Sequence, residues 1–341
     1  MDAVQFSEHG GREVIEYGEF PDPEIEGDEV LVDVKAGALN HLDIWTRKGL
    51  PGLDLEMPHV PGSDCAGVVS EVGEDVTRFG EGDRVALLAG VGDERMDDPT
   101  FDPRFHIIGE HVRGVHSEFA AIPEDNLVSV PEHVEWETAA AAPLVFQTAW
   151  RMLIHRGELQ AGEDALGLGA SGGAGHAAVQ VAAHAGATVY ATASSDEKLE
   201  YAGEIGADET INYAEEEFGS AVRELTDGQG VDMVVDHIGA ETWDDSLKSL
   251  AKGGRIVTCG ATTGPNPGAG LNRMFWNQLS VIGSTMATPE QAEEGLSLVW
   301  DGTFEPKIRE TLPMSEAARA HEIIEEREGF GKVVVVPDSE L

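Results

Sequence analysis

The fold is decided by the stretch Asp164-Ala-Leu-Gly-Leu-Gly-Ala-Ser-Gly-Gly-Ala-Gly-His176 and the alanine-rich run that follows it to Gly186. This pattern predicts a buried strand over 165–169, a glycine turn over 170–175 and a helix over 176–185. The turn has the spacing G-x-G-x-x-G with Ala170 in place of the first glycine, which suits close approach of the backbone to a pyrophosphate at a helix amino end. A purely structural glycine turn is the alternative. The predicted cradle comprises Ala170, Ser171, Gly172, Gly173, Ala174 and Gly175.

Alternating strand and helix patterns surround this turn. Further strands are predicted over 188–193, 231–236, 255–259 and 279–283, with helices starting at Ser195 and over 214–226 and 242–251. Such alternation is typical of a parallel, doubly wound α/β sheet, in which ligands bind at the carboxyl ends of the strands. The ligand crevice is therefore expected at the turns 169–175, 193–195, 237–239 and 260–264, which include Gly239 and Gly260.

The composition favours a two-domain protein of the cytoplasm. The chain has 341 residues, of which 41% are hydrophobic, enough for two cores. The sequence shows neither an apolar leader nor a long apolar span, so a cytoplasmic protein is expected. The two cysteines, Cys65 and Cys259, lie far apart in apolar runs and are expected to be buried thiols.

The net charge is strongly negative. The chain carries 64 acidic and 22 basic residues, for a net charge of -42, and only seven of the basic residues are lysines. Because about 1 M salt shortens the screening length to about 3 Å, such a surface is tolerated best in concentrated salt. We therefore interpret the chain as a halophilic protein. The same charge argues against nucleic acid or an anionic membrane as a partner.

The flanking regions predict a second domain of a different kind. Short extended runs over 29–36, 66–72, 84–88 and 117–122 are typical of an antiparallel, barrel-like domain. Residues 131–156 are predicted to be helical. Thr288-Pro-Glu-Gln291 is a capping box that starts a helix, a further helix is predicted over 315–327, and a strand over 332–337 should pair with the amino-terminal domain. The α/β domain, 132–288, is thus expected to be inserted in a domain formed by 1–131 and 289–341.

Several motifs carry a resemblance to a known family. They are Pro61-Gly-Ser-Asp-Cys-Ala-Gly-Val-Val-Ser-Glu-Val-Gly73, Gly80-Glu-Gly-Asp-Arg-Val85, Gly169-Ala-Ser-Gly-Gly-Ala-Gly175, Gly206-Ala-Asp208, Val231-Asp-Met-Val-Val-Asp236 and Gly253-Gly-Arg-Ile-Val257. Over nearly its whole length the chain resembles the medium-chain dehydrogenases/reductases. The resemblance implies a Rossmann domain inserted in a GroES-like barrel, and a homodimer formed near 281–284. The family includes zinc alcohol dehydrogenases, zinc-free quinone reductases and enoyl reductases.

The resemblance also implies that no catalytic metal is bound. The positions of the family's zinc ligands correspond to Asn40, Ser63 and Leu144, which do not form a zinc site, and the position of the proton-relay hydroxyl to Leu42. The place of the structural zinc lobe, 90–114, has no cysteine. An unusual site could be assembled from His41, His59, His106, His111 and His116 with Asp43 or Asp64. We expect instead that the loop histidines are surface residues, and that the two aspartates hold turns or pair with an arginine.

The end of the second predicted strand bears on the choice of cofactor. An acid there selects NAD, whereas this strand ends in Ala193-Ser-Ser195. The resemblance to quinone reductases implies that Ser194, Lys198 and Tyr213 contact the 2′-phosphate of NADP. Lys198 as a solvated helix residue and Tyr213 as a core residue are the alternatives, and the nearby Asp196 and Glu197 keep NAD possible.

The candidate catalytic residues are Asn40, His41, Asp43 and Thr148. Asn40 is expected to donate a hydrogen bond to a substrate oxygen, His41 to supply a proton, and Thr148 to lie beside the nicotinamide. A capped turn for Asn40, simple packing for His41 and a helix back-bond for Thr148 are the alternatives. The aromatic residues Trp45, Phe275 and Trp276 are expected to form a wall of the site, or else to pack in the core.

Without a metal, positioning and hydrogen bonding must carry the reaction, which favours acceptors that delocalise charge. The sequence therefore predicts an NADPH-dependent, zinc-independent oxidoreductase that transfers hydride to a quinone, an enone or another conjugated carbonyl. One alternative is an NAD(P)-dependent alcohol or aldehyde dehydrogenase with atypical zinc ligands. Another is a catalytically silent NADPH-binding protein.

Overall fold

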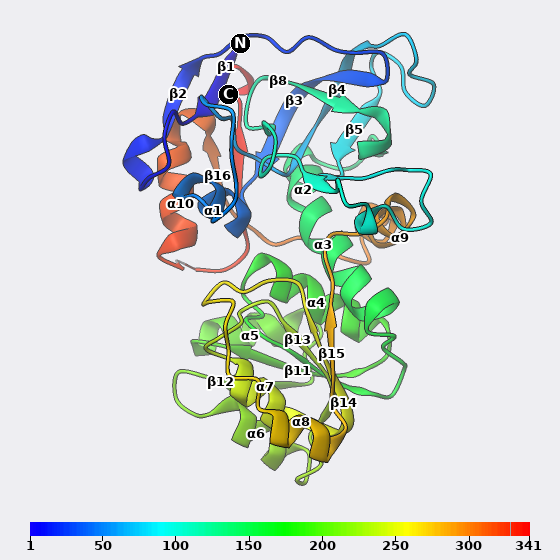
Figure 1. Cartoon of the computed structure of the whole chain (residues 1–341), viewed down its shortest axis with the longest axis vertical. Coiled ribbons are helices and arrows are strands. Elements are labelled where there is room, and N and C mark those ends of the chain that lie inside the picture. Colours follow the sequence, from blue (N-terminus) through cyan, green and yellow to red (C-terminus); the bar gives the residue numbers. More distant parts are fainter. Residues whose placement is uncertain (328) are drawn as a thin grey trace. The chain divides into compact units, whose positions relative to one another are not determined.

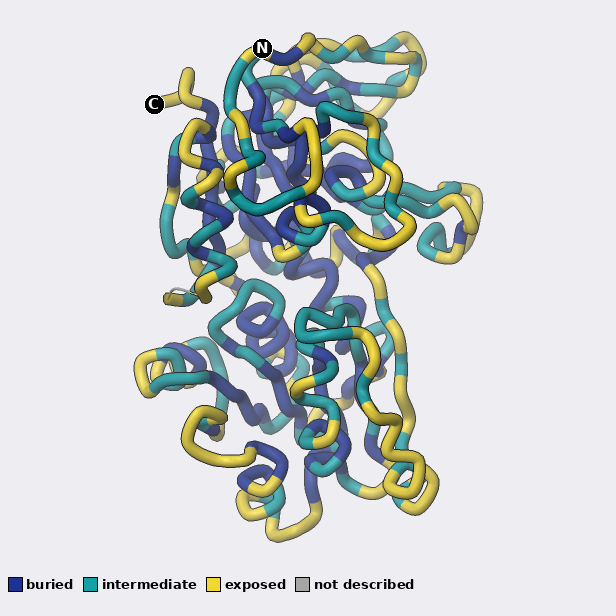
Figure 2. The backbone as a smooth tube through the Cα atoms, turned by 60° about the vertical axis from the view of Figure 1, so that its left-hand side comes forward, coloured by how far each residue is buried: buried dark blue, intermediate teal, exposed yellow. Residues whose placement is uncertain are grey.

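The computed structural model describes residues 1–327 and 329–341, and its contacts divide the chain into two compact units (Figure 1). Unit 1 consists of Met1–Leu144, Ala287–Glu328 and Lys332–Leu341, and unit 2 of Val145–Met286 and Gly329–Gly331. Because the chain enters and leaves unit 2 within unit 1, unit 2 is an insertion, as the sequence predicts. In each unit the buried residues lie in the interior, and the exposed residues lie mostly in peripheral segments (Figure 2).

Unit 2 is built on a six-stranded parallel sheet with the order β12-β11-β10-β13-β14-β15. The sequence thus predicts its doubly wound class correctly. Its core joins Leu166 of β10, Ile211 of β12 and Val234 of β13 with Val222 of a covering helix, all fully buried. The strands are β10 (Asp164–Gly167), β11 (Thr188–Ala193), β12 (Glu209–Asn212), β13 (Val231–Asp236), β14 (Leu250–Thr258) and β15 (Ser280–Gly283).

Helices alternate with these strands. The first follows the glycine turn and packs on β10 and β11, and another packs on β13 and β14. The predicted glycine stops are present, since Gly186 and Gly206 both have positive φ just after a helix. The helices are α4 (Gly173–His184), α5 (Asp196–Glu204), α6 (Phe218–Leu225), α7 (Trp243–Ser249) and α8 (Leu271–Asn277).

Unit 1 is built on a seven-stranded sheet. Its order is β16-β17-β3-β4-β5-β9, and β8 also pairs with β3. The pairs that join β3, β4, β5, β8 and β9 are antiparallel, as the sequence predicts, whereas β16 and β17 run parallel. The strands of this sheet are β3 (Glu29–Ala38), β4 (Cys65–Val72), β5 (Arg84–Leu87), β8 (Phe119–Pro123), β9 (Leu127–Ser129), β16 (Ile308–Pro313) and β17 (Lys332–Val336).

The remaining elements of unit 1 surround this sheet. Two small antiparallel pairs are formed by β1 (Asp2–Gln5) with β2 (Glu16–Glu19), and by β6 (Gly90–Val91) with β7 (His106–Ile107). Its helices are α1 (His41–Lys48), α2 (Trp136–Ala141), α9 (Pro289–Trp300) and α10 (Ala317–Glu325). The predicted capping box starts α9, where the hydroxyl of Thr288 accepts a hydrogen bond from the backbone N–H of Gln291.

The segment predicted as one helix over 131–156 has three parts. These are α2, then α3 (Pro143–Trp150), then a π-helical segment, Arg151–Arg156. The proline at 143 explains the break between the first two, because it cannot donate a helical hydrogen bond. Residues 132–144, which are predicted to belong to the inserted domain, lie in unit 1, where α2 packs on β3 and β4.

Candidate functional site

The glycine turn of unit 2 has the shape that a phosphate cradle needs. Gly169 has φ +60°, so the sharp turn falls at this residue, one before the motif position occupied by Ala170. A Cβ at Gly175 would collide with the carbonyl oxygen of Gly169, so this position requires glycine. Gly172 precedes α4 with extended backbone, and the free N–H groups of the helix follow it. The residues present therefore fit a dinucleotide pyrophosphate.

The four turns predicted to line one crevice are adjacent in unit 2. The backbone N–H of Ala170 donates to the carbonyl of Thr192, which places the first turn beside the end of β11. A Cβ at Gly169 would contact the ring of His237, and one at Gly239 would press on Ala261. The carboxyl ends of β10, β11, β13 and β14 thus meet, and this group of turns includes both Gly239 and Gly260.

The predicted 2′-phosphate residues lie at the carboxyl ends of β11 and β12. Lys198 lies in the first turn of α5, and its Nζ is 3.4 Å from the hydroxyl oxygen of Ser194. The backbone N–H of Tyr213 donates to the carbonyl of Ala193, which places Tyr213 at the same end of the sheet. The alternative that Tyr213 is a core residue is wrong, because its side chain is exposed. Two of the three residues are thus in hydrogen-bond range, and the third lies on the neighbouring strand end.

Unit 1 contains a buried polar cluster centred on Asn40. The Nζ of Lys332 donates to Oδ1 of Asn40 at 2.6 Å and to Oδ2 of Asp64 at 3.0 Å. Nδ2 of Asn40 donates to the same Oδ2 at 2.8 Å, and the backbone N–H of Leu144 donates to Oδ1 of Asp64 at 2.9 Å. Lys332 is only 3% exposed and Asp64 is fully buried. We call Asn40, Asp64 and Lys332 the amide cluster.

The register of three strands brings the amide cluster together. In the antiparallel pairing of β17 with β3, Val334 lies opposite Ala38, so two residues further along Lys332 lies opposite Asn40. The backbone N–H of Ala38 donates to the carbonyl of Asp64, which directly precedes β4. The sequence does not reveal Lys332 as a site residue, because it lies 292 positions from Asn40 along the chain. The available signal was one lysine at the head of a strand that otherwise consists of valines.

Asp43 supports this site from within α1. Its carboxylate accepts hydrogen bonds from the backbone N–H of Asn40 at 2.7 Å and of Gly62 at 3.1 Å. Burial raises the pKa of Asp43 to about 6, against the opposing effect of these hydrogen bonds and of Lys332. Burial also raises the pKa of Asp64, and Lys332 opposes this shift. Asp43 holds a turn, as expected, whereas Asp64 pairs with a lysine and not with the expected arginine.

The residues at the family's zinc position do not fit a zinc ion. Asn40, Ser63 and Leu144 provide no set of three ligands, and the ammonium of Lys332 lies among them. Across residues 1–327 and 329–341, no group of three or more histidine, cysteine, aspartate or glutamate side chains is placed to hold a metal ion. We therefore derive no step that depends on a metal.

Two of the remaining candidate residues are placed as follows. His41 is exposed at the first position of α1, with its ring centroid 6.2 Å from that of Trp45. Thr148 is buried in α3, four residues after Leu144. Its hydroxyl has no hydrogen-bond partner among the described residues, so the alternative of a helix back-bond is excluded. A buried hydroxyl of this kind is a candidate for ligand contact.

The expectation of an aromatic wall formed by Phe275 and Trp276 is wrong. Both lie in α8, which ends three residues before β15 begins at Ser280, opposite Arg255 near the start of the β14 pairing. Helix α8 therefore lies at the amino ends of the strands, the end of the sheet opposite the glycine turn. Core packing is excluded as well, because the two side chains are 68% and 74% exposed.

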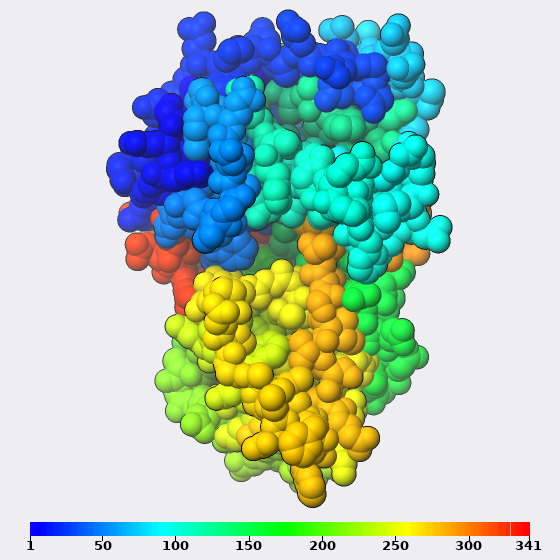
Figure 3. Space-filling view, in the orientation of Figure 1, coloured from blue at the N-terminus to red at the C-terminus, as the bar shows by residue number. Residues whose placement is uncertain are grey.

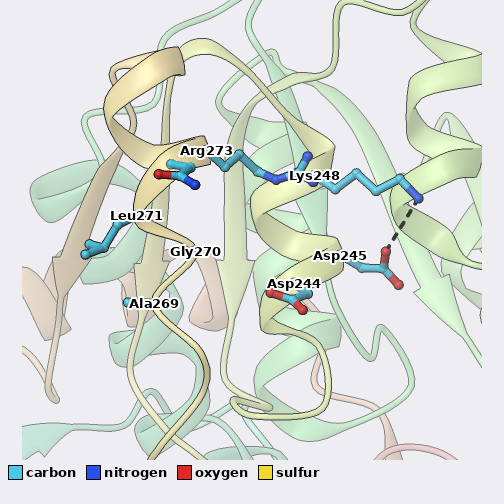
Figure 4. A pocket seen from close by; sticks show the side chains of 8 residues that line it. Asp244, Asp245, Lys248, Ala269, Gly270, Leu271 and Arg273 are labelled. Atoms are coloured by element: carbon cyan, nitrogen blue, oxygen red, sulfur yellow. Dashed lines mark ion pairs between the residues drawn. The ribbon is translucent and has the colours of Figure 1, made fainter.

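An open hollow of about 620 Å³ lies between α7 and α8 (Figure 4). The side chain of Arg273 extends towards α7, whereas that of Lys248 runs away from Arg273 and forms an ion pair with Asp245. The hollow lies near the same end of the sheet as α8. It is separate from the turns that form the nucleotide cradle.

The histidines near the lobe 90–114 are not all surface residues. His116 is fully buried, contrary to expectation, because the absence of a side chain at Gly37 and Gly62 makes room for its ring. Burial lowers the pKa of His116 to about 4, and that of His59 likewise to about 4. His111 is exposed.

Ion pairs link residues within the lobe 90–114, which corresponds to the structural zinc lobe of other family members. Arg104 contacts both Asp93 and Asp102, and the backbone N–H of Asp93 donates to Asp102 at 2.9 Å. Hydrogen bonds from Arg95 lower the pKa of Asp93 to about 2.

Comparison with known proteins agrees with this architecture. A family model for the alcohol dehydrogenase GroES-like domain matches residues 26–132, and one for zinc-binding dehydrogenases matches residues 173–301. A quinone oxidoreductase of Pseudomonas aeruginosa is 35% identical, with 98% of this chain and 99% of that protein covered.

Solved structures give the same result. An NAD-dependent alcohol dehydrogenase is 42% identical with a TM-score of 0.94, over 98% of this chain and 99% of that one. A crotonyl-CoA carboxylase/reductase in complex with NADP is 25% identical with a TM-score of 0.92, over 99% and 95% of the two chains. The fold, the nucleotide cradle and these relatives define an oxidoreductase that uses a nicotinamide cofactor. The chain belongs to the medium-chain dehydrogenase/reductase family.

The helices of the described residues are all too short or too polar to span a membrane.

Proposed function

We propose that this protein is an NADPH-dependent, zinc-independent reductase of conjugated carbonyl compounds such as quinones and enones. The observation that carries the proposal is the amide cluster, in which Lys332, Asn40 and Asp64 occupy the region of the family's metal position. The quinone oxidoreductase and the crotonyl-CoA carboxylase/reductase among its relatives support this class of acceptor.

The reduced nicotinamide, when bound, supplies a hydride. After hydride addition to a conjugated acceptor, the negative charge is delocalised over several atoms. The carbonyl oxygen carries the largest share of it. Asn40 stabilises that oxygen by donating an amide N–H, a contribution that matters most in a water-excluded site. His41, at the exposed start of α1, delivers the proton that completes the reduction. The buried hydroxyl of Thr148 is proposed to orient the nicotinamide.

The preference for NADPH rests on Ser194, Lys198 and Tyr213. A cation and a hydroxyl after β11, with the phenol hydroxyl of Tyr213 after β12, suit a phosphate better than a ribose hydroxyl, and no acid stands at the end of β11. Asp196 and Glu197, which follow in α5, act in the opposite direction and reduce the preference.

An NAD-dependent alcohol dehydrogenase is the second candidate function. It is favoured by the structural relative of that description, which shares 42% of its sequence with this chain. Oxidation of a simple alcohol requires stabilisation of an alkoxide, for which the family's zinc members have a metal, and the residues here do not supply its ligands. We therefore rank it second.

A panel of acceptors tests the proposal. The protein, purified in concentrated salt, is assayed with NADPH and NADH against 1,4-benzoquinone, cyclohex-2-enone and crotonyl-CoA. The reverse direction is assayed with NADP⁺ and NAD⁺ against primary and secondary alcohols. We expect the highest kcat/KM with a conjugated acceptor and NADPH. A preference for alcohols with NAD would support the second candidate, and tight NADPH binding without turnover would indicate a binding protein.

We also propose that the protein is a homodimer that pairs through β15. This edge strand and the preceding α8 carry the large exposed apolar side chains Leu271, Phe275, Trp276 and Val281, and the segment lies on the surface in Figure 3. An exposed apolar edge strand is an association site unless it is covered. Light scattering after gel filtration should give twice the chain mass, and Val281→Lys should give the monomer.

A further inference from the structure

Lys332 is a buried ammonium that the reaction proposed above does not use. It is 3% exposed, and its two hydrogen-bond acceptors, Asn40 and Asp64, are also buried. Withdrawing a lysine from water is unfavourable, and a buried ion pair is often no more stabilising than apolar residues of similar volume. The neighbouring residues of β17 are all valines. An apolar residue would therefore suffice if position 332 served only to pack the strand.

Lys332 and Asp64 together determine which way the amide of Asn40 points. Its Oδ1 accepts from Nζ of Lys332, and its Nδ2 donates one hydrogen to Asp64. An ammonium only donates and a carboxylate only accepts, so the flipped amide would lose both hydrogen bonds. In the described residues the second hydrogen on Nδ2 has no acceptor. It is the hydrogen available to a substrate oxygen.

We propose that Lys332 is a positioning residue of the reaction, whose ammonium holds the Asn40 carboxamide with one N–H directed to the carbonyl oxygen of the acceptor. Asp64 is the counter-ion that permits the ammonium to be buried and the second anchor of the amide. Because Asn40 acts on the substrate and Lys332 acts through Asn40, this inference rests on the proposed function.

Removing Lys332 alone would leave Asp64 as an unpaired buried charge and could unfold the protein. The test variant is therefore Lys332→Met with Asp64→Asn, which removes both charges and keeps an oxygen to accept from the backbone N–H of Leu144. Lys332→Arg is the conservative variant, since a guanidinium can donate to both partners. The matched control is Lys35→Met, because Lys35 is also ion-paired in unit 1 but contacts Asp33 and Glu340.

For the double variant we expect kcat with 1,4-benzoquinone to fall at least about tenfold, while the NADPH dissociation constant changes less than about twofold. Adding Asn40→Ala to the double variant should cause no further loss, because residues that act as a unit are not additive. Lys332→Arg should retain most of the turnover and Lys35→Met all of it. Melting curves confirm that each variant is folded.

The outcomes separate this inference from the proposed function. If the wild type turns over quinone and the folded double variant is equally active, or if Asn40→Ala adds its full loss, the inference is wrong and the function stands. If the wild type reduces no conjugated acceptor, the function fails, and the side-chain amide NMR signals of ¹⁵N-labelled asparagine test the inference alone. The Asn40 signal should be slowly exchanging in the wild type and averaged in the double variant; an unchanged signal would overturn the inference.

Discussion

Replacing Lys198 with alanine should weaken the binding of NADPH much more than that of NADH. The side chain lies in the first turn of α5, with Nζ 3.4 Å from the hydroxyl of Ser194. The only difference between the two cofactors is the 2′-phosphate, so a residue that binds this group affects one cofactor and not the other.

The size of the effect follows from the surroundings of Lys198. A hydrogen bond to a charged group contributes about 1.5 to 3 kcal/mol, or about 10- to 150-fold in the dissociation constant. Asp196 and Glu197 in the same turn, together with the net charge of -42, oppose phosphate binding. Concentrated salt screens the exposed part of the interaction further. We therefore expect the lower end, about tenfold for NADPH, and less than about twofold for NADH.

The assay is a fluorescence titration of each reduced cofactor at fixed, high salt. Lys252→Ala is the matched control, because it removes the same charge from unit 2 at an exposed position near the start of β14, away from the carboxyl ends of the strands. It should leave both dissociation constants unchanged. Equal losses for NADPH and NADH in the Lys198 variant would refute the 2′-phosphate assignment, and a similar effect of Lys252→Ala would indicate a general charge effect.

Four further predictions concern helix α5, the cradle, a buried histidine and the surface charge. Gly203→Ala should raise the free energy of unfolding by about 0.5 to 1 kcal/mol, because the added Cβ would meet no atom within 4 Å and alanine favours the helical conformation of α5. Gly175→Ala should abolish NADPH binding, because the added Cβ would collide with Gly169. Unchanged NADPH binding by this variant would contradict the assignment of the glycine turn as a phosphate cradle. Because the pKa of His116 is lowered to about 4, the unfolded state binds its proton first, and the wild type should lose about 1.4 kcal/mol per pH unit from this residue as the pH falls from 6.5 towards 4. Urea unfolding of His116→Asn should show a shallower slope there, and an identical slope would mean that His116 does not titrate in this way. Because the net charge is -42, the melting temperature should rise steeply as KCl increases to about 2 M, and a salt-independent value would refute the halophilic interpretation.

Local pattern was sufficient to predict much of the fold. Strands β11 and β13 have the predicted bounds, because runs such as Val231–Asp236 are apolar and flanked by turn residues. Strand β12 was missed, since Ile211 is its only apolar residue and the strand lies at the sheet edge. The break of the helix predicted over 131–156 falls at Pro143, which can be read from the sequence, whereas the packing of α2 on β3 and β4 cannot.

The candidate site was predictable where it depends on backbone and not where it depends on register. The glycine turn can be recognised in the sequence, because position 175 has no room for a side chain. Asn40 was identified because it occupies one of the family's metal-ligand positions. Lys332 could not be assigned, because its neighbours depend on how β17 pairs with β3. The exposed histidine expected at 116 is buried for a similar reason, since Gly62 makes room for it from a distant segment. The prediction that Phe275 lines the site was wrong, because an aromatic residue in the sequence does not indicate at which end of a sheet it lies.

The central claim is that the amide cluster of Asn40, Asp64 and Lys332 takes the place of a catalytic metal. Its most direct test is the metal content of the protein, purified in concentrated salt, measured by mass spectrometry together with NADPH oxidation by 1,4-benzoquinone before and after chelation. The account predicts no stoichiometric zinc and the same turnover after chelation. About one zinc per chain, with turnover that chelation removes and zinc restores, would contradict it.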